Sequence, residues 1–559
     1  MDERKRRERE KPAVLIRAAL IVLIALALRA IYLSLITRTA CLDINMDPIS
    51  DMEAFHRWAM TIVDGDWLGR SDFHPYHPWQ IAIAPPEQWA AWYGHVFHQE
   101  PVYPYLIALL YLFAPRSPLS VIVAQMVLGS LGCAFVYLAA RRLMREGAAL
   151  WAGILSAIYG PTLYYESLML RDTFMMPMSA LLIWLIVEAR RSGGRAARAW
   201  WFSAGLVGGL LYATKASVLP FLLLCMLWVL WCGRSGEIAG ARKAAALMLA
   251  GCVLALTPVV ARNIIVGAPP LLTTTRGPVE FINGNNPWHV GVGWFEGDAQ
   301  SVTTYARGIL TRSGGRLLPT MAAVLSDWSS RPGAFLWLQV RKMGYLLAPF
   351  EMPNNASYSY FRENSALLRR GLPWFHWISP LALLGLIVSW RRRRLFMPIY
   401  LFLAAGGAVT VAFYVIARFR APFMPAVMML AGLGLWSILR SARRRRWGRL
   451  ARSVLLVVAG LSLNTAFGLT DDQLVRPQDY AIAIEGYKAR GMMEQALEEA
   501  DRGRRRFPAF AHFHKAAGFL ALELGKRTEA LEALEAALAR DPSDDETRRA
   551  VSRLAETPP

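Results

Sequence analysis

The sequence predicts an all-α protein that crosses a membrane about eleven times and ends in a separate helical module. Of its 559 residues, 55% are hydrophobic. These residues gather into runs of about 18 to 24, long enough to cross a hydrocarbon core of roughly 30 Å as helices. After residue 470 the chain changes to charged, alanine-rich segments with helical spacing, which are typical of a water-exposed helical module.

The apolar runs divide the chain into three parts. Residues 1–12 form a basic tail, residues 13–469 form the transmembrane domain, and residues 470–559 form the C-terminal module. The predicted spans are 13–36, 118–140, 148–168, 172–189, 199–214, 216–232, 244–265, 373–390, 395–416, 422–440 and 452–469. Two long loops interrupt this series, at 37–117 and 266–372.

Clusters of basic residues predict the orientation of these spans. They fall at Arg4–Arg9, Arg141–Arg145, Arg190–Arg198, Arg234–Lys243, Arg391–Arg394 and Arg443–Arg449. When the spans are threaded, every cluster lies on one side, which the positive-inside rule makes the cytoplasmic side. The N-terminus is then cytoplasmic, and both long loops and the C-terminal module are outside. The net charge of +21 is explained by these clusters, so we expect no nucleic acid partner.

A repeat in the C-terminal module predicts its fold. Ala496 and Pro508 recur as Ala530 and Pro542, in both cases after 34 residues. This period, with Gly518 at a position where two helices meet closely, is typical of tetratricopeptide repeats. An unrelated pair of helical hairpins is the alternative. Two such units are fewer than usual, so we expect the module to pack on the membrane domain or on a partner.

The first long loop combines helical patterns with acidic residues. Residues 51–68 carry apolar side chains at helical spacing, and the apolar segment 101–114 is too short to span. Asp51 and Glu53 lie at the end of the first span. A carboxylate here could accept a proton from a hydroxyl group or bind a divalent cation. The alternative is a solvated loop acid.

Histidines are concentrated in the same loop, with the pairs His74/His77 and His95/His98 at a spacing of three. This spacing suits a metal only if the segment is helical. His98, next to Glu100, is the better candidate, and a purely hydrogen-bonding role is the alternative. The five cysteines are too scattered to predict a metal or disulfide framework.

Four sequence blocks carry a resemblance to a known family. They are Ser50-Asp-Met-Glu-Ala-Phe-His-Arg-Trp-Ala, Gln99-Glu-Pro-Val-Tyr-Pro-Tyr, Pro258-Val-Val-Ala-Arg-Asn with Gly284-Asn-Asn-Pro, and Ala417-Arg-Phe-Arg-Ala-Pro. In order and placement they resemble the GT-C glycosyltransferases. The likeness is greatest to the bacterial family-39-like branch, related to protein O-mannosyltransferases and to the lipid A aminoarabinose transferase. Met52 separates Asp51 from Glu53 where many relatives have adjacent Asp-Glu, which leaves the role of Glu53 open.

The resemblance implies a polyprenyl-phosphate sugar donor, with Asp51 as the general base toward the acceptor. A lipid phosphate needs cations to balance its charge. Span ends supply Arg262, Arg418, Arg420 and Lys215 as donor-phosphate ligands. The alternative for each of these residues is that its charge reaches the lipid headgroups.

Glu166 and Asp172 flank Arg171 at the tip between the third and fourth predicted spans. Together with Glu53, His98 and Glu100, these two acids are candidates for an acceptor or metal neighbourhood; a simple arginine–carboxylate cap is the alternative. Arg29 lies inside the first span, where a charge is costly, so we expect it to face protein or the donor phosphate.

The expected function is therefore that of a hexosyl or pentosyl transferase in a bacterial inner membrane. It would move a monosaccharide from a polyprenyl-phosphate donor to a protein, or to an envelope glycan or lipid, which the C-terminal module recruits. A divalent cation is a possible cofactor and no other is expected. Two alternatives remain: a transporter or flippase of lipid-linked sugars, and a non-catalytic scaffold for envelope assembly.

Overall fold

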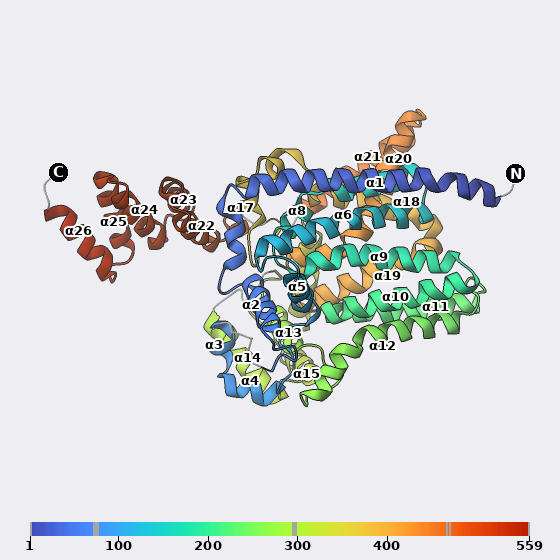
Figure 1. Cartoon of the computed structure of the whole chain (residues 1–559), viewed down its shortest axis with the longest axis horizontal. Helices are drawn as coiled ribbons and strands as arrows, with labels where there is room; N and C mark the ends of the chain where they lie inside the picture. The colour runs from blue at the N-terminus through green and yellow to red at the C-terminus, as the bar shows by residue number, and fades with distance from the viewer. Residues whose placement is uncertain (1–2, 71–77, 293–298, 466–467, 469–470, 557–559) are drawn as a thin grey trace.

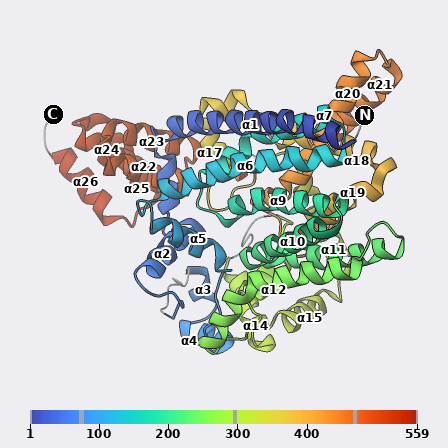
Figure 2. The ribbon, with the colours of Figure 1, turned by 45° about the vertical axis from the view of Figure 1, so that its right-hand side comes forward.

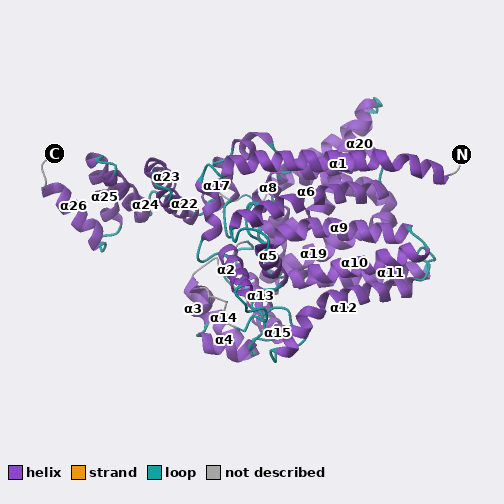
Figure 3. Cartoon of the chain, in the orientation of Figure 1, coloured by secondary structure: helices purple, strands orange, loops and turns teal. Residues whose placement is uncertain are grey.

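The protein is a bundle of long helices with shorter helices gathered at one end. The computed structural model describes residues 3–70, 78–292, 299–465, 468 and 471–556. Within these residues every regular element is a helix and no strand occurs (Figure 3). The C-terminal helices extend from the end of the bundle that carries the long loops, opposite the N-terminus of the chain (Figure 1). The predicted all-α fold is confirmed.

Helices occupy the position of every predicted span. They are α1 (Glu3–Ile36), α6 (Pro118–Leu143), α7 (Glu146–Ile158) with α8 (Gly160–Glu166), α9 (Arg171–Arg191), α10 (Gly194–Thr214), α11 (Leu219–Arg234), α12 (Ala241–Ile265), α18 (Phe375–Ser389), α19 (Arg393–Ala412), α20 (Met424–Arg443) and α21 (Trp447–Thr465). By length and composition, seven segments of the described chain could cross a membrane. Since α7, α10 and α21 are outside those seven, the number of eleven spans stays a prediction.

Two of the long helices touch through their backbones. A Cβ atom added to Gly205 of α10 would lie 2.0 Å from the carbonyl oxygen of Met248 in α12. One added to Gly251 would lie 2.2 Å from the carbonyl oxygen of Phe202. Small residues allow helices to approach this closely inside a membrane. The contact fixes α10, whose last turn leads into Lys215.

The long loops form a cap of short helices over one end of the bundle. These are η1 (Ala40–Met46), α2 (Asp51–Val63), α3 (Pro78–Ile83), α4 (Pro86–Tyr93), α5 (Val102–Tyr111), α13 (Arg276–Asn285), α14 (Ala299–Ser313), α15 (Leu317–Trp328), α16 (Pro332–Leu347) and α17 (Tyr358–Glu363). The predicted apolar face of α2, which includes Phe55, Trp58 and Ile62, is buried in the core of this cap. Short turns of 3-10 helix, η2 (Ala216–Val218) and η5 (Ala417–Phe423), join spans beneath it.

The C-terminal module consists of successive antiparallel helices: α22 (Pro477–Ala489), α23 (Met493–Arg506), α24 (Ala511–Glu523), α25 (Arg527–Arg540) and α26 (Asp545–Glu556). Ala496 and Ala530 are fully buried, and a Cβ on Gly518 would lie 2.5 Å from Leu534 Cγ. Pro508 follows the end of α23, as predicted from the repeat. The assignment to the tetratricopeptide family stays a prediction.

The module packs directly on the cap. The ring of Tyr480 in α22 meets that of Tyr360 in α17 edge-on, with centroids 4.9 Å apart. Both rings belong to a hydrophobic core that continues from the first span, through Cys41 in η1, into the module. Figure 2 shows α22 and α23 beside α17. The expectation that the module leans on the membrane domain is confirmed for this structure.

Candidate active site

Asp51 is the first residue of α2, and the local sequence explains why the helix starts there. Ser50 is the N-cap, and its hydroxyl accepts a hydrogen bond from the Glu53 backbone at 3.3 Å. The hydroxyl and the backbone N–H of Ser50 both donate to the carbonyl of Asp47, at 2.8 and 2.9 Å. This capping arrangement favours an acid in the first turn, where the helix dipole stabilises negative charge.

Donors from four distant segments reach the Asp51 carboxylate in the described part of the chain. At Oδ1 these are Gln99 Nε2 at 2.9 Å and Arg276 Nη1 at 3.2 Å. At Oδ2 they are Asn355 Nδ2 at 2.9 Å and Arg418 Nη2 at 2.8 Å. Two guanidinium groups stabilise the charged form of a carboxylate. Asp51 is thus the meeting point of both long loops and the η5 turn.

Further ion pairs surround this centre. Lys215 Nζ lies 2.9 Å from Asp172 Oδ1, Arg171 pairs with Glu100, and Arg276 Nε lies 3.0 Å from Glu280 Oε1. Of the described residues, the cluster comprises the acids Asp51, Glu100, Asp172 and Glu280 and the bases Arg171, Lys215, Arg276 and Arg418. Their formal charges cancel. This balance allows the group to be buried, because isolated charges would be costly there.

Burial and neighbouring charges act in opposite directions on the pKa of Lys215 and of Arg276, two of the cations that line the adjoining cavity. Burial lowers the pKa of Lys215 to about 8, although Asp172 acts to raise it. For Arg276, burial also acts to lower the pKa, but Asp51 and then Glu280 outweigh it, so that the pKa is raised. Arg276 is therefore a permanent cation, whereas Lys215 can lose its proton near neutral pH.

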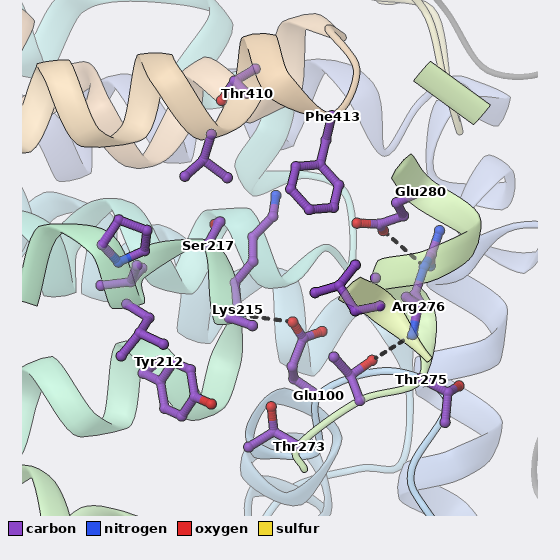
Figure 4. A pocket seen from close by; sticks show the side chains of 18 of the residues that line it. Glu100, Tyr212, Lys215, Ser217, Thr273, Thr275, Arg276, Glu280, Thr410 and Phe413 are labelled. Carbon is purple, nitrogen blue, oxygen red and sulfur yellow. Dashed lines mark hydrogen bonds and ion pairs between the residues drawn. The ribbon is translucent and has the colours of Figure 1, made fainter. Parts of the chain in front are cut away.

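A cavity of about 650 Å³ lies next to the cluster. Glu100, Arg171, Lys215, Arg276 and Glu280 line its polar end, and Figure 4 shows Lys215 and Glu100 opposite Arg276 and Glu280. Its other wall is apolar and comes from α11, α19 and the residues after them, with Leu219, Phe221, Phe402, Val409 and Phe413 among its members. A polar end joined to an apolar wall suits a ligand with an ionic head and a hydrocarbon tail.

Asp51 and Arg418 are not part of the cavity wall. Arg276 lines the cavity and also bonds to Asp51, so it stands between the two. The Asp51 side chain keeps 11% of its surface exposed. Arg276 therefore connects the cavity with the Asp51 carboxylate.

Two of the predicted phosphate ligands are placed elsewhere. Arg262 donates to the carbonyls of Leu68, Gly69 and His95 at 2.7 to 2.9 Å. Its guanidinium lies 3.7 Å from the centroid of the Phe97 ring. This arginine clamps the first loop to α12. Its N–H groups are directed to these carbonyls, and Arg262 is not among the residues that line the cavity with Lys215.

Arg420 also points away from the cavity. It pairs with Glu351 at 3.0 Å and donates to the carbonyl of Phe350 at 2.7 Å. Glu351 in turn accepts from the hydroxyl of Tyr165 at 2.8 Å. Arg418, two residues earlier, is the one member of this Arg-Phe-Arg block that reaches Asp51, because a 3-10 turn directs the two side chains to different sides.

Two of the remaining predicted acids, Glu53 and Glu166, also have partners outside the cluster. Glu53 pairs with Arg57 at 2.5 Å along α2, and burial raises its pKa while Arg57 opposes that effect. Glu166 forms a bidentate pair with Arg29, at 2.7 and 2.8 Å. The expectation that Arg29 faces protein is confirmed. Of the predicted neighbourhood, Glu100 and Asp172 join the cluster, and Glu53 and Glu166 do not.

The histidines do not assemble a metal site in the described residues. His98 Nδ1 lies 3.2 Å from the hydroxyl of Thr275, and it helps to align the Gln99 segment with the second loop. His74 and His77 are outside the described residues. No group of three or more His, Cys, Asp or Glu side chains that could hold a metal occurs in the part that the structure describes. A divalent cation stays a prediction.

The sequence did not single out Gln99, Arg276, Glu280 or Asn355 as site residues. Gln99 is inside one of the four family blocks, next to Glu100, so the block indicated the place but not the residue. Arg276 carries a usable signal: it is an arginine in a predicted outer loop, against the general bias of positive charge to the inner side. Asn355 carries no such signal.

The architecture and this site are those of a polytopic helical membrane protein with a charged cluster beside an amphipathic cavity. Residues 98–261 match the family model described as dolichyl-phosphate-mannose-protein mannosyltransferase. The match includes Glu100, Arg171, Asp172 and Lys215, all members of the cluster. The predicted resemblance to the GT-C superfamily of glycosyltransferases is confirmed for this part of the chain. No curated protein sequence matches.

Several solved structures are similar to the chain, and two of them show the range of the similarity. One is the Archaeoglobus fulgidus oligosaccharyltransferase tethered with an acceptor peptide, with 16% identity and a TM-score of 0.46; the similarity covers 87% of this chain and 59% of that one. The other is ArnT from Cupriavidus metallidurans bound to undecaprenyl phosphate, with 14% identity, a TM-score of 0.40, and 88% and 80% covered. The chain thus spans about three fifths of the length of the oligosaccharyltransferase. At these scores neither structure identifies the activity of this chain.

Proposed function

We propose that this protein transfers a monosaccharide from a polyprenyl-phosphate donor to an acceptor at the predicted outer face of the membrane. The observation that carries the proposal is the cavity of about 650 Å³, in which an apolar wall meets Lys215 and Arg276. Arg276 also contacts Asp51, so a phosphate held there would place its sugar near a carboxylate.

The donor fits this cavity by its chemistry. Its phosphodiester would bind Lys215 and Arg276, and its hydrocarbon chain would lie along α11 and α19. Guanidinium groups bind phosphate oxygens in a bidentate manner, and the buried setting strengthens that attraction. Because the charges of the cluster already cancel, the incoming negative charge must displace an existing carboxylate partner.

Arg276 is the cation whose partner exchange matters most. It contacts both Asp51 and Glu280, at 3.2 and 3.0 Å. If it turns to the phosphate, Oδ1 of Asp51 loses a charged donor and keeps the neutral Gln99 amide. A carboxylate with fewer cationic partners is a stronger base. Donor binding would in this way activate Asp51.

The transfer itself is a single displacement. Asp51 accepts the proton of an acceptor hydroxyl while that oxygen forms a bond to the anomeric carbon of the sugar. The bond between the anomeric carbon and the phosphate oxygen breaks, and the electron pair leaves with polyprenyl phosphate. Lys215 and Arg276 stabilise this developing negative charge. The anomeric configuration is inverted.

The acceptor is proposed to be a protein or an envelope glycan or lipid, recruited by the C-terminal module. The module is packed on the cap that contains Asp51, so a molecule bound to the module would be near the site. The predicted requirement for a divalent cation is tested by adding a chelator to the transfer assay.

The proposal is tested with purified protein, radiolabelled lipid-linked sugars extracted from bacterial membranes, and envelope proteins and glycans as acceptors. The variants are Asp51→Asn and, as a matched control, Asp64→Asn at the other end of α2, where the side chain is 61% exposed. We expect Asp51→Asn to reduce transfer by roughly 100-fold or more, and Asp64→Asn to be close to the unchanged protein.

Equal transfer by Asp51→Asn and the unchanged protein would remove the base role. If the unchanged protein moves lipid-linked sugar across vesicle membranes without transferring it, the transporter alternative is correct. Glycosylation that persists in cells with Asp51→Asn, but stops without the C-terminal module, would favour the scaffold.

A further inference from the structure

The N-terminus of α22 contacts the loop that holds Asn355. Arg476, the N-cap residue of α22, donates through its guanidinium to the carbonyl of Asn355. Its backbone N–H donates to Ser357 Oγ at 2.8 Å, and Ser357 N–H donates to Asp479 Oδ2 at 2.8 Å. Asp479 is completely buried. This loop is thus pinned to the C-terminal module on both sides of Ala356.

The loop and Asp51 are in direct contact. The side chain of Asn355 donates from Nδ2 to Asp51 Oδ2 at 2.9 Å. A path of two hydrogen bonds therefore connects Arg476 in the module with the carboxylate in the site. The path passes through the backbone carbonyl and the side chain of one residue.

Arg476 also reaches the turn that precedes Asp51. Its Nη2 lies 3.4 Å from Asp47 Oδ2. The other oxygen of Asp47 accepts from Ile49 N–H at 3.2 Å, and the carbonyl of Asp47 accepts from Ser50. Asp47 therefore organises the turn from which α2 starts. One arginine of the module holds both the backbone that carries Asp51 and a partner of its side chain.

Attachment of the module alone does not require this arrangement. Tyr480 already bonds to Glu363 at 2.9 Å, and Arg490 pairs with Asp43 and donates to the carbonyl of Thr39 at 2.9 Å. Arg490 is a second module arginine on a first-loop acid, but its partners do not contact Asp51. Arg490 thus attaches the module to the cap, whereas Arg476 attaches it and also contacts groups that hold Asp51.

We propose that Arg476 and Asn355 are positioning residues, through which the C-terminal module sets the orientation of the Asp51 carboxylate. The inference rests on the proposed function, because it gives Asp51 its catalytic role. It assigns the module a part in the chemical step in addition to any recruitment of the acceptor.

The first test compares two matched pairs of variants in the transfer assay with extracted radiolabelled donors. Arg476→Ala is compared with Arg490→Ala, and Asn355→Ala with Asn354→Ala. We expect Arg476→Ala and Asn355→Ala to reduce kcat by about 10- to 100-fold, since small displacements of a catalytic group have effects of that size. KM for the donor should stay within about twofold, because the cavity is unaffected. The two controls should keep kcat.

A double variant tests whether the two residues act on one path. If they do, Arg476→Ala with Asn355→Ala lowers kcat no further than the stronger single variant, because contacting residues are not additive. Independent multiplication of the two losses would overturn the proposed path. So would kcat values for Asn355→Ala and Asn354→Ala that agree within about twofold.

A second test does not depend on activity. Hydrogen exchange of the purified full chain is measured for segments 47–53 and 354–358. Arg476→Ala should accelerate exchange in both segments relative to Arg490→Ala, since its bonds hold both. Unchanged exchange overturns the inference even if the enzyme is active. If transfer is absent from the unchanged protein, the proposed function fails, while the exchange result still decides whether the module orders the segment around Asp51.

Discussion

Two buried groups of ion pairs in this protein differ in their surroundings. Arg29 and Glu166, each 1% exposed, form a closed bidentate pair between α1 and α8. Asp51 shares its oxygens among donors from separate segments, and one of these donors, Arg276, faces a large cavity. Neither residue of the first pair lines the large cavity, so a ligand bound there would not compete for their contacts. The second can exchange partners with a ligand, and this difference separates a structural pair from a site.

Breaking the closed pair should have the largest effect. Arg29→Met leaves Glu166 as a buried charge without its partner, which costs about 3–5 kcal/mol. We expect a large loss of folded protein, measured by thermal unfolding of the purified protein in detergent. Arg29→Met combined with Glu166→Met should recover much of that loss, because an apolar pair removes the unpaired charge. A single variant as stable as the unchanged protein would contradict the closed-pair interpretation.

Removing a cation from the cluster around Asp51 should change the kinetics with the donor more than it changes thermal stability. Arg276→Gln removes one charge-assisted contact to phosphate, worth about 1.5–3 kcal/mol, or roughly 10- to 100-fold in kcat/KM. The control is Arg262→Gln, which alters the clamp on the first loop and not the cavity. We expect it to lower thermal stability with a smaller change in donor KM. The reverse order of the two donor effects would show that the phosphate binds elsewhere.

The smallest expected effect is the change of kcat/KM with pH. Burial lowers the pKa of Lys215 to about 8, with Asp172 opposing this shift. The lysine is thus charged below pH 8 and loses its proton as the pH rises through 8. Because free-enzyme groups govern kcat/KM, this parameter should fall about tenfold between pH 7 and pH 9. Lys215→Arg should remove that fall, and a profile that is the same in both proteins would exclude Lys215 as the titrating group.

The sequence predicted the helices well because their length and apolar character are local properties of the chain. It also placed Asp51, Glu100, Asp172 and Lys215 at one end of the bundle, where the structure joins them in one cluster. Contacts across the fold were not predictable in the same way. Asn355 is more than 300 residues from Asp51 and lies in a loop without periodicity.

The direction in which a side chain points was also not predictable from the sequence. Arg418 and Arg420 are both at a span end, as predicted, yet only the first faces Asp51. Arg262 lies at the expected end of α12 but binds carbonyls of the first loop. Position along a helix predicts the depth of a side chain in the membrane. Which neighbour it meets depends on how distant loops fold over it.

The backbone contact between α10 and α12 has a geometric consequence for the surface above it. Gly205 and Gly251 have no side chain, so the backbone of each helix lies directly against the other. This contact sets the distance between α10 and α12. Lys215 directly follows the end of α10, and Arg262 in the last turn of α12 binds the carbonyl of Leu68. The distance between Lys215 and the part of the first loop that follows α2 therefore depends on how closely α10 and α12 pack, and glycines within the two helices make that close packing possible.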